Sequence, residues 1–279
     1  MKIYNTSDHI IVEHENLCYI PNNQDWDSFI NHTNLFNRLL QELPNYQLIG
    51  DETILNTKHI LAPIANQEIW ASGVTYMRSK HARMEESQES GGATFYDKVY
   101  DADRPELFFK STPSRTVGPG QKVRIRKDST WDVPEPELTL FINSDSEIVG
   151  YTIGNDMSSR SIEGENPLYL PQAKMYDGAA ALGPCILVLE EPIHPETLIS
   201  IQISRENSDA FEGTIAINQM KRKHTELVEY LFREQTFPKG VFLMTGTGIV
   251  PGNDFTLQAG DVVSITIEGI GTLVNEVAL

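Results

Sequence analysis

The sequence predicts an α+β fold that is mainly β, in which a small N-terminal α/β domain (residues 1–63) precedes a larger β-rich domain (residues 64–279). From residue 64 onward, short apolar segments bounded by turn residues recur, and only one further stretch has the periodicity of a long helix. Many short strands with few helices indicate closed or layered sheets. A chain of 279 residues with 40% hydrophobic content is long and apolar enough for both domains.

The N-terminal domain combines Asn-rich polar stretches with one predicted amphipathic helix. Asp25 is in position to cap this helix and Pro44 to end it. The apolar residues that fall mainly on one helical face are Trp26, Phe29, Ile30, Phe36, Leu39 and Leu40. We place the domain boundary at Ala62-Pro63, because strand-like segments dominate beyond it.

In the larger domain, one long helix is expected over residues 219–234, with Leu227 and Leu231 turned inward. Short strands account for most of the remaining pattern. Outside the hairpin described below, the strand-like segments are residues 68–72, 107–110, 123–126, 185–189, 200–204, 241–245 and 261–267.

Residues 78–106 do not fit the strand pattern, because they hold many charges and little apolar periodicity. This stretch is long for a structureless connection in a compact domain, and such loops commonly carry function. It follows Tyr76 directly and leads toward Lys110, so we expect a lid over a binding site, with Gly91-Gly92 as its hinge. A plain surface excursion is the alternative.

Residues 138–142 and 148–153 alternate apolar and polar side chains on either side of a run of turn residues, and therefore predict an antiparallel hairpin. If the turn centres on Asp145 and Ser146, the numbers of paired residues sum to about 291. This register extends beyond the apolar segments and pairs residue 135 with residue 156.

Three carboxylates converge at that open end of the hairpin. Residues two apart in a strand point to the same face, so Glu135 and Glu137 project side by side, and Asp156 lies opposite Glu135. Three acids with no Cys or His at ligand spacing nearby suit a hard divalent ion such as Mg²⁺ or Mn²⁺ rather than zinc. The spacing alone equally allows a solvated acidic strand face.

Composition limits the classes of partner. The formal net charge of −17 argues against nucleic acid and anionic membranes, which both attract basic patches. A small anionic substrate would then need local positive charge. Cys18 and Cys185 lie far apart, and there is no charged-then-apolar leader and no apolar run near 18 residues, so we expect a cytoplasmic protein.

From about residue 71 to the end, the chain resembles the fumarylacetoacetate hydrolase superfamily. Within it, the sequence looks most like the branch of 2-keto-3-deoxy-D-arabinonate dehydratases. The resemblance rests on six blocks in the expected order, which are SGVTY at 72–76, RPELFFK at 104–110, PEPEL at 134–138, GYTI at 150–153, ENPLYLPQ at 165–172 and TGT at 245–247.

This resemblance implies a mixed β-sandwich roll for the larger domain and a metal held by Glu135, Glu137 and Asp156. The implied cofactor is Mg²⁺, with Mn²⁺ or Ca²⁺ as substitutes. The implied reaction is dehydration of a 2-keto-3-deoxy sugar acid through a metal-stabilised enolate, with 2,5-dioxopentanoate as the product for an arabinonate-type substrate. A homo-oligomer, either a dimer or a tetramer, is expected from the same family.

A divalent ion that chelates the carboxylate and the 2-oxo group of such an acid makes the C3 proton acidic, and a buried neutral lysine is then a suitable base. Lys174 matches the position where the superfamily keeps a site lysine. Lys110 is the second candidate, because a lysine is unexpected at the end of an apolar strand. A surface lysine paired with an acid is the alternative for either residue.

Further side chains are candidates for binding the substrate. Arg78 and Arg160 are suited to pair with its carboxylate, although each is equally suited to a salt bridge with the metal-site acids. The loop Thr245-Gly246-Thr247 resembles the superfamily's substrate loop, in which glycine lets the backbone approach a ligand and threonine hydroxyls donate hydrogen bonds. The full candidate set is Tyr76, Arg78, Arg160, Gln172, Thr245, Gly246 and Thr247.

The spacing of His81 and Glu85 helps to distinguish a dehydratase from a C–C bond hydrolase. Hydrolases of the superfamily use a histidine with a nearby glutamate to activate water for C–C cleavage, so an acylpyruvate- or fumarylacetoacetate-type hydrolase is the alternative. In the hydrolase pattern the histidine follows the tyrosine by three residues and the glutamate follows the histidine by three. Here His81 follows Tyr76 by five residues and Glu85 follows His81 by four, which also suits a structural helical pair. A silent sugar-acid-binding protein would have lost a metal carboxylate or Lys174, and neither is lost.

Overall fold

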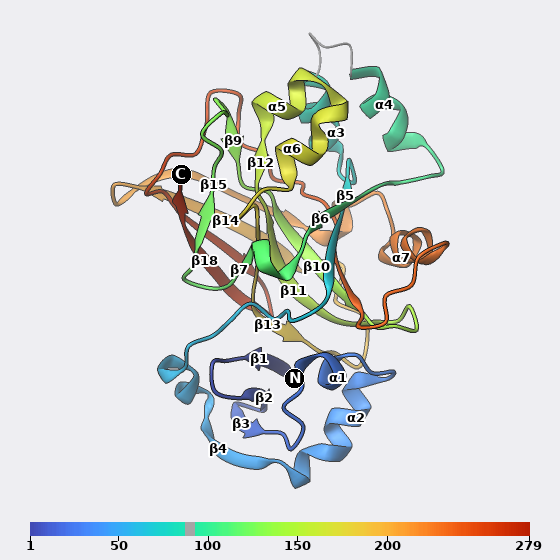
Figure 1. Cartoon of the computed structure of the whole chain (residues 1–279), viewed down its shortest axis with the longest axis vertical. Helices are drawn as coiled ribbons and strands as arrows, with labels where there is room; N and C mark the ends of the chain where they lie inside the picture. The colour runs from blue at the N-terminus through green and yellow to red at the C-terminus, as the bar shows by residue number, and fades with distance from the viewer. Residues whose placement is uncertain (87–92) are drawn as a thin grey trace.

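The computed structural model describes residues 1–86 and 93–279, and in these residues a large mixed sheet is layered against a smaller one (Figure 1). The large sheet has the order β4-β3-β2-β1-β13-β11-β10-β16-β5-β6, and β7 pairs with β13. Its strands are β1 (Lys2–Asn5), β2 (Ile10–His14), β3 (Leu17–Ile20), β4 (Gln47–Asp51), β5 (Glu68–Gly73), β6 (Glu106–Ser111), β7 (Thr116–Val117), β10 (Pro136–Ile142), β11 (Ile148–Asp156), β13 (Ala180–Leu187) and β16 (Val241–Met244).

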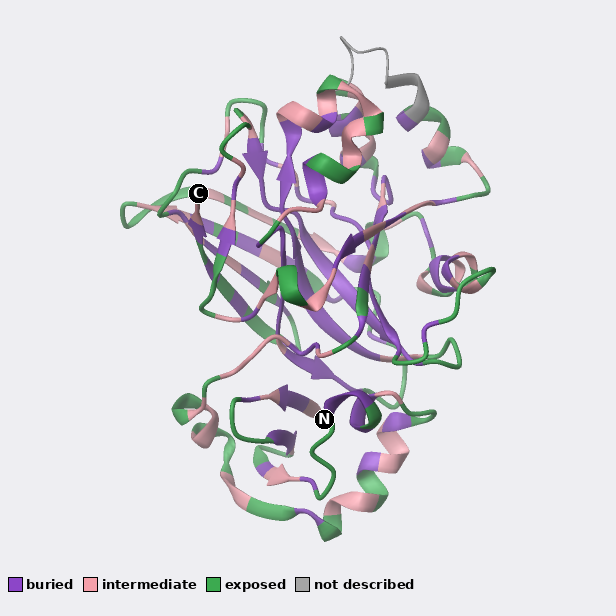
Figure 2. Ribbon diagram, in the orientation of Figure 1, coloured by how far each residue is buried: buried purple, intermediate pink, exposed green. Residues whose placement is uncertain are grey.

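The smaller sheet has the order β15-β14-β17-β18-β8. Its strands are β8 (Lys122–Arg124), β14 (Leu198–Arg205), β15 (Ser208–Ala216), β17 (Val262–Ile267) and β18 (Gly271–Ala278), and β9 (Asp132–Val133) pairs separately with β12 (Ser158–Ser159). Leu140 of β10, Ile201 of β14 and Ile265 of β17 belong to one buried cluster between the layers. The central strands are accordingly buried along most of their length (Figure 2). The fold class is therefore confirmed.

The predicted β10–β11 register is confirmed. Glu137 pairs with Gly154 and Leu138 with Ile153, so the residue numbers of these pairs sum to 291 (137 + 154 and 138 + 153). Just before β10 begins, Glu135 exchanges both backbone hydrogen bonds with Asp156, the last residue of β11, at 3.2 and 3.0 Å. Each alternate side chain along the hairpin therefore has a fixed face.

The first 63 residues form a lobe at one end of the molecule, drawn in blue in Figure 1. Its strand β1 pairs with β13, so the large sheet runs into the lobe without a break. The domain boundary at residue 63 remains a prediction. The lobe's helical elements are α1 (Trp26–Ile30), α2 (Leu35–Glu42), and the 3₁₀ helices η1 (Leu43–Asn45) and η2 (Glu52–Thr57).

The single long helix predicted in this lobe is wrong. Asp25 does cap α1, accepting a hydrogen bond from the Ser28 N–H. The chain then leaves the helix, and Asn34 adopts a left-handed φ of 52° before α2 begins. Asparagine tolerates this conformation better than most residues. The break also turns Leu40 outward, where it is 44% exposed.

The region from residue 78 to 106 is largely helical where it is described, and the expected lid over a binding site remains a prediction. It contains α3 (Met77–Glu86) and α4 (Ala93–Asp101). The predicted hinge Gly91-Gly92 lies outside the described residues. In Figure 1 these helices gather with α5 (Arg160–Glu165) and α6 (Leu170–Lys174) at the end opposite the lobe. The short 3₁₀ helices η3 (Pro113–Arg115), η4 (Pro167–Tyr169) and η5 (Ile217–Gln219) complete the elements.

The predicted helix over 219–234 begins later than expected, as α7 (His224–Phe232), with Leu227 and Leu231 buried as predicted. Residues 220–222, which were predicted to be helical, instead contact the α3–α4 region. Met220 bridges Tyr76, and Lys221 donates its backbone N–H to the carbonyl of Thr75 at 2.9 Å. The Arg222 guanidinium donates to the carbonyls of Val99 and Asp103, both at 3.2 Å. The segment 220–222 therefore ties down both ends of the α3–α4 region.

Within the described part of the chain, no helix has the length and apolarity that crossing a bilayer requires.

Leu140 tests the packing between the two layers. Its side chain is fully buried, so Leu140→Ala should lower the free energy of unfolding by about 2–5 kcal/mol through lost burial and an unfilled cavity. Urea unfolding followed by tryptophan fluorescence measures this change. Leu48→Ala is the matched control, because Leu48 is 56% exposed and should change stability by less than about 0.5 kcal/mol. Equal effects in the two variants would contradict the assigned core.

Candidate active site

Glu135, Glu137 and Asp156 form a buried cluster at the open end of the β10–β11 hairpin. Each offers a carboxylate oxygen within 4.8 Å of the others. Their exposures are only 4%, 1% and 1%. Glu135 and Glu137 share a face because they are two apart in an extended chain, and backbone pairing brings Asp156 alongside. The alternative of a solvent-exposed acidic strand face is therefore wrong, because all three carboxylates are buried.

Two buried lysines contact this cluster. Lys174, at the end of α6, places Nζ 2.6 Å from Glu135 Oε2 and 3.2 Å from Asp156 Oδ2. Lys110, on β6, places Nζ 2.5 Å from Asp156 Oδ1 and donates to the carbonyl of Met157 at 3.0 Å. Both side chains are fully buried. The alternative that either residue is a surface lysine is therefore wrong.

Two buried arginines complete the ring of positive charge. Arg160 donates from Nη2 to Glu135 Oε1 at 2.8 Å, so the salt-bridge arrangement is the one observed for it. Arg83, on α3, lies 3.9 Å from the same oxygen and contacts the carboxylate of Glu163 on α5. Ser158 in turn donates to Glu163 at 2.9 Å. The acids are therefore compensated on several sides, as buried charge requires.

Arg83 was not among the residues predicted from the sequence. One pattern could have revealed it: Tyr76, Ser79 and Arg83 are spaced by three and four residues, and all three are buried. The charged residues that lie between these three in the sequence made the pattern hard to recognise as one buried helix face.

Glu106 is a second residue that the sequence reasoning missed. It begins β6, on the same strand face as Phe108 and Lys110, so it points toward the carboxylate cluster. Its carboxylate occupies the space where a side chain at Gly73 would lie, since a Cβ there would meet Glu106 Oε2 at 2.1 Å. The described residues offer that buried oxygen no hydrogen-bond partner. The alternation Glu106, Phe108, Lys110 was the available signal.

The electrostatic environment gives Glu137, Glu106 and Asp156 different pKa shifts. Burial, together with the charges of Asp156 and Glu135, raises the pKa of Glu137 well above its ordinary value. Burial also raises the pKa of Glu106, although Arg83 and Lys174 oppose this. Burial acts on Asp156 in the same direction, but the Lys110 and Lys174 ammonium groups outweigh it and hold its pKa below the usual range.

Burial lowers the pKa of Lys110, and the neighbouring Lys174 ammonium lowers it further, whereas the Asp156 carboxylate opposes both. Lys110 therefore sits in a setting that weakens its hold on a proton.

The Thr245-Gly246-Thr247 loop approaches the cluster as expected for backbone that contacts a ligand. Gly246 has a left-handed φ of 92° and donates its N–H to Glu137 Oε2 at 2.6 Å. A Cβ at this position would meet the Thr75 hydroxyl oxygen at 2.1 Å, which explains the glycine. Thr245 donates its hydroxyl to the carbonyl of Leu138 at 2.8 Å, so it fastens the loop to β10.

Tyr76 is 1% exposed, and its hydroxyl has no partner among the described side chains and backbone groups. Burial, with a smaller contribution from Glu137, raises its pKa, so the phenol stays neutral and able to donate a hydrogen bond.

Four residues predicted from the sequence lie away from the carboxylate cluster: Arg78, His81, Glu85 and Gln172. His81 and Glu85 lie on the exposed side of α3, and Glu85 Oε2 is 3.8 Å from Arg78 Nη1 at the surface. Gln172 is also exposed, and its carbonyl accepts a hydrogen bond from Arg126 at 3.1 Å. Their suggested roles remain predictions.

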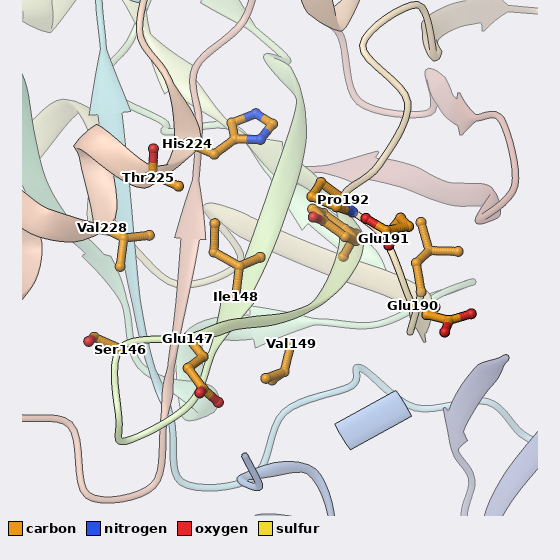
Figure 3. Close-up of a pocket in the computed structure, with 12 residues that line it drawn as sticks. Ser146, Glu147, Ile148, Val149, Glu190, Glu191, Pro192, His224, Thr225 and Val228 are labelled. Atoms are coloured by element: carbon orange, nitrogen blue, oxygen red, sulfur yellow. The ribbon is translucent and has the colours of Figure 1, made fainter. Parts of the chain in front are cut away.

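The residues around the cluster enclose a narrow cavity with free space of about 10 Å³. It is lined by Ser72, Gly73, Val74, Ser79, Arg83, Phe108, Glu135, Glu137, Asp156, Lys174, Gly246 and Thr247. A larger cavity of about 520 Å³ lies beside the hairpin turn and α7, where Glu147, Glu190 and His224 line it (Figure 3). Among the described residues, only the first cavity contains three acids within ligating distance. The narrow cavity is therefore the candidate site.

Comparison with known proteins identifies the family. The model of the fumarylacetoacetate (FAA) hydrolase C-terminal domain matches residues 68–278, a span that contains every residue of the cavity. The chain belongs to the fumarylacetoacetate hydrolase family. The resemblance inferred from the six sequence blocks is thus confirmed.

Similar members of the fumarylacetoacetate hydrolase family are sugar-acid dehydratases. The chain is 50% identical over 241 residues to a probable 2-keto-3-deoxyxylonate dehydratase of Haloferax volcanii, covering 86% of this chain and 82% of the relative. It is 46% identical over 235 residues to the 2-dehydro-3-deoxy-D-arabinonate dehydratase of Saccharolobus solfataricus, covering 84% and 79%.

A solved 2-keto-3-deoxy-D-arabinonate dehydratase complexed with magnesium and 2,5-dioxopentanoate superposes with a TM-score of 0.81. Its sequence is 37% identical, and the match covers 99% of this chain and 98% of that one.

The donor set of this family member fits a magnesium ion. Three carboxylates supply only oxygen ligands, which Mg²⁺ prefers, and the described residues that line the cavity include no histidine or cysteine. The raised pKa of Glu137 points the same way, because a buried anion with acidic neighbours gains stability from a bound cation.

Glu137→Gln should abolish binding of Mg²⁺ and Mn²⁺ while preserving the fold, because the amide oxygen can still accept the Gly246 hydrogen bond. Isothermal titration calorimetry measures the binding, and circular dichroism checks the fold. Glu196→Gln, at an exposed position, is the matched control and should bind as the parent does. Undiminished binding by Glu137→Gln would show that the ion sits elsewhere.

Proposed function

We propose that this protein is a Mg²⁺-dependent hydro-lyase that dehydrates a 2-keto-3-deoxy sugar acid, such as 2-keto-3-deoxy-D-arabinonate, to 2,5-dioxopentanoate or a close analogue. The main support is one arrangement: three buried carboxylates, two of which contact Lys174 Nζ directly, in a chain 46% and 50% identical to two dehydratases. Glu135, Glu137 and Asp156 would hold the ion. When bound, Mg²⁺ polarises the 2-oxo group of the substrate and makes its C3 proton acidic.

In this proposal Lys174 removes the C3 proton. Its Nζ lies inside the cavity and within hydrogen-bond reach of two of the metal-site carboxylates, so it is close to any acid chelated there. Lys110 is the second candidate because its pKa is lowered, but Asp156 and two backbone carbonyls accept its hydrogen bonds. Those contacts suit a residue that holds Asp156 and the end of α6 in place.

Glu106 is the candidate for the acid that protonates the departing C4 hydroxyl. Burial favours its protonated form, and only a protonated carboxyl donates a proton. Its position over Gly73, on the cavity wall, places it on the same sheet face as the metal-site acids. Lys174 and Glu106 then divide the two proton transfers of an elimination.

The hydrolase alternative receives less support. A water-activating dyad must face the substrate, whereas His81 and Glu85 are exposed on α3. The dehydratase proposal extends to a cytoplasmic homo-oligomer, for which the two buried free thiols, Cys18 and Cys185, are compatible with a reducing compartment. Light scattering in solution measures the subunit number.

Incubation with Mg²⁺ and a panel of acids tests the reaction. We expect 2-keto-3-deoxy pentonates to lose one molecule of water, as measured by mass spectrometry, because the site has a candidate base and a candidate acid, whereas His81 and Glu85 face away from it. Acylpyruvates serve as the comparison and should stay intact. Cleavage of acylpyruvates into two fragments, without dehydration of the sugar acids, would establish the hydrolase instead.

Lys174→Met tests the base. The variant keeps the bulk of the side chain but accepts no proton, so turnover should fall by about 10²-fold or more. Exchange of the C3 hydrogens of pyruvate in deuterated water, followed by NMR, isolates the first step. Lys122→Met is the matched control, because Lys122 is exposed and pairs only with Glu276 at the surface. Parent-like exchange by Lys174→Met would transfer the role to Lys110.

A further inference from the structure

One residue on the inward face of α3 is an arginine, Arg83, and nothing in the proposed reaction yet uses it. Arg83 is 3% exposed and lines the cavity, whereas its helix neighbours His81 and Glu85 face outward. Because the hydrolase pattern expects its dyad in this segment, the position of Arg83 bears directly on which reaction the cavity favours.

The guanidinium of Arg83 is held in place from several directions. It contacts Glu163, whose other oxygen accepts a hydrogen bond from Ser158 at 2.9 Å, and it lies 3.9 Å from Glu135 Oε1. The ring of Tyr96 lies 5.8 Å from its central carbon. Glu163 is 1% exposed, so this ion pair is not screened by water. A group fixed this firmly is preorganised to contact a bound molecule.

Charge compensation determines which kind of group Arg83 can bind. Two carboxylates already balance its positive charge, so it has little net charge to offer a substrate carboxylate, which the metal ion would bind in any case. A guanidinium carries five N–H donors in a fixed fork, so one that contacts Glu163 can also donate to an oxygen of a bound molecule, and it neither accepts a hydrogen bond nor loses its proton in proteins. The matching partner is an oxygen that gains negative charge during the reaction.

We propose that Arg83 binds the C4 oxygen of the substrate and stabilises it as it leaves, and thereby directs the common enolate toward elimination rather than hydrolysis. This inference rests on the proposed function. In the step, the C4–O bond breaks and its electron pair moves to oxygen, while the electrons left at C3 form the new C=C bond. Glu106 supplies the proton that completes the water molecule. Arg83 forms no covalent bond and transfers no proton, and a guanidinium cannot accept the proton of an attacking water.

Two measurements on one variant separate this role from a structural one. Arg83→Met should lower the rate of dehydration by about 10²-fold, the usual loss for one transition-state donor. Its rate of C3 hydrogen exchange with pyruvate should match the parent, because that acid has no C4 hydroxyl to leave. Arg83→Lys, which keeps the charge opposite Glu163, should retain folding and restore part of the dehydration rate. Arg104→Met, an exposed arginine beyond α4, is the matched control and should leave both rates unchanged.

Loss of exchange and dehydration together in both Arg83 variants would overturn the inference and assign Arg83 to maintaining the site. Parent-like dehydration in Arg83→Met would overturn it as well. Failure of the proposed function looks different: the parent protein itself would exchange C3 hydrogens but dehydrate none of the 2-keto-3-deoxy acids.

Discussion

The backbone pairing of Glu135 with Asp156 is the constraint on which the site depends. It extends the β10–β11 ladder by one pair before the start of β10 and places three carboxylates in a buried space. Isolated buried carboxylates are costly to ionise, so such a cluster persists only with nearby cations. The surrounding elements meet this need: β6 contributes Lys110, α3 contributes Arg83, α5 contributes Arg160 and α6 contributes Lys174.

These cations also give each acid a different character. Asp156 touches two ammonium groups and is held ionised, whereas Glu137 accepts a hydrogen bond from the backbone N–H of Gly246 and has its pKa raised by burial and by the charges of Asp156 and Glu135. The same compensation that makes the cluster stable therefore leaves one position where an added divalent ion gains most. The contacts that stabilise the buried carboxylates are therefore also the contacts that set their pKa values.

The sequence predicted the parts of the site that depend on local rules. Strand alternation and a turn of known centre were enough for the Glu135, Glu137 and Asp156 cluster, because a two-residue period and an antiparallel register follow from covalent geometry. Arg83 and Glu106 were missed because their roles depend on how α3 and β6 pack against the hairpin. The single helix in the N-terminal lobe was wrong because the left-handed Asn34 interrupts an otherwise regular apolar period.

The anchoring of the α3–α4 region has an evolutionary consequence. Residues 220–222 hold Thr75 and Tyr76 at one end and Val99 and Asp103 at the other, so the two ends stay together whatever lies between them. For a flexible loop closed at its base, doubling the length costs only about 0.6 kcal/mol of closure entropy. Insertions in this region that keep Arg83 in place therefore change the wall of the cavity at little thermodynamic cost, and they keep a charge that compensates the carboxylate cluster while new substrates are accommodated.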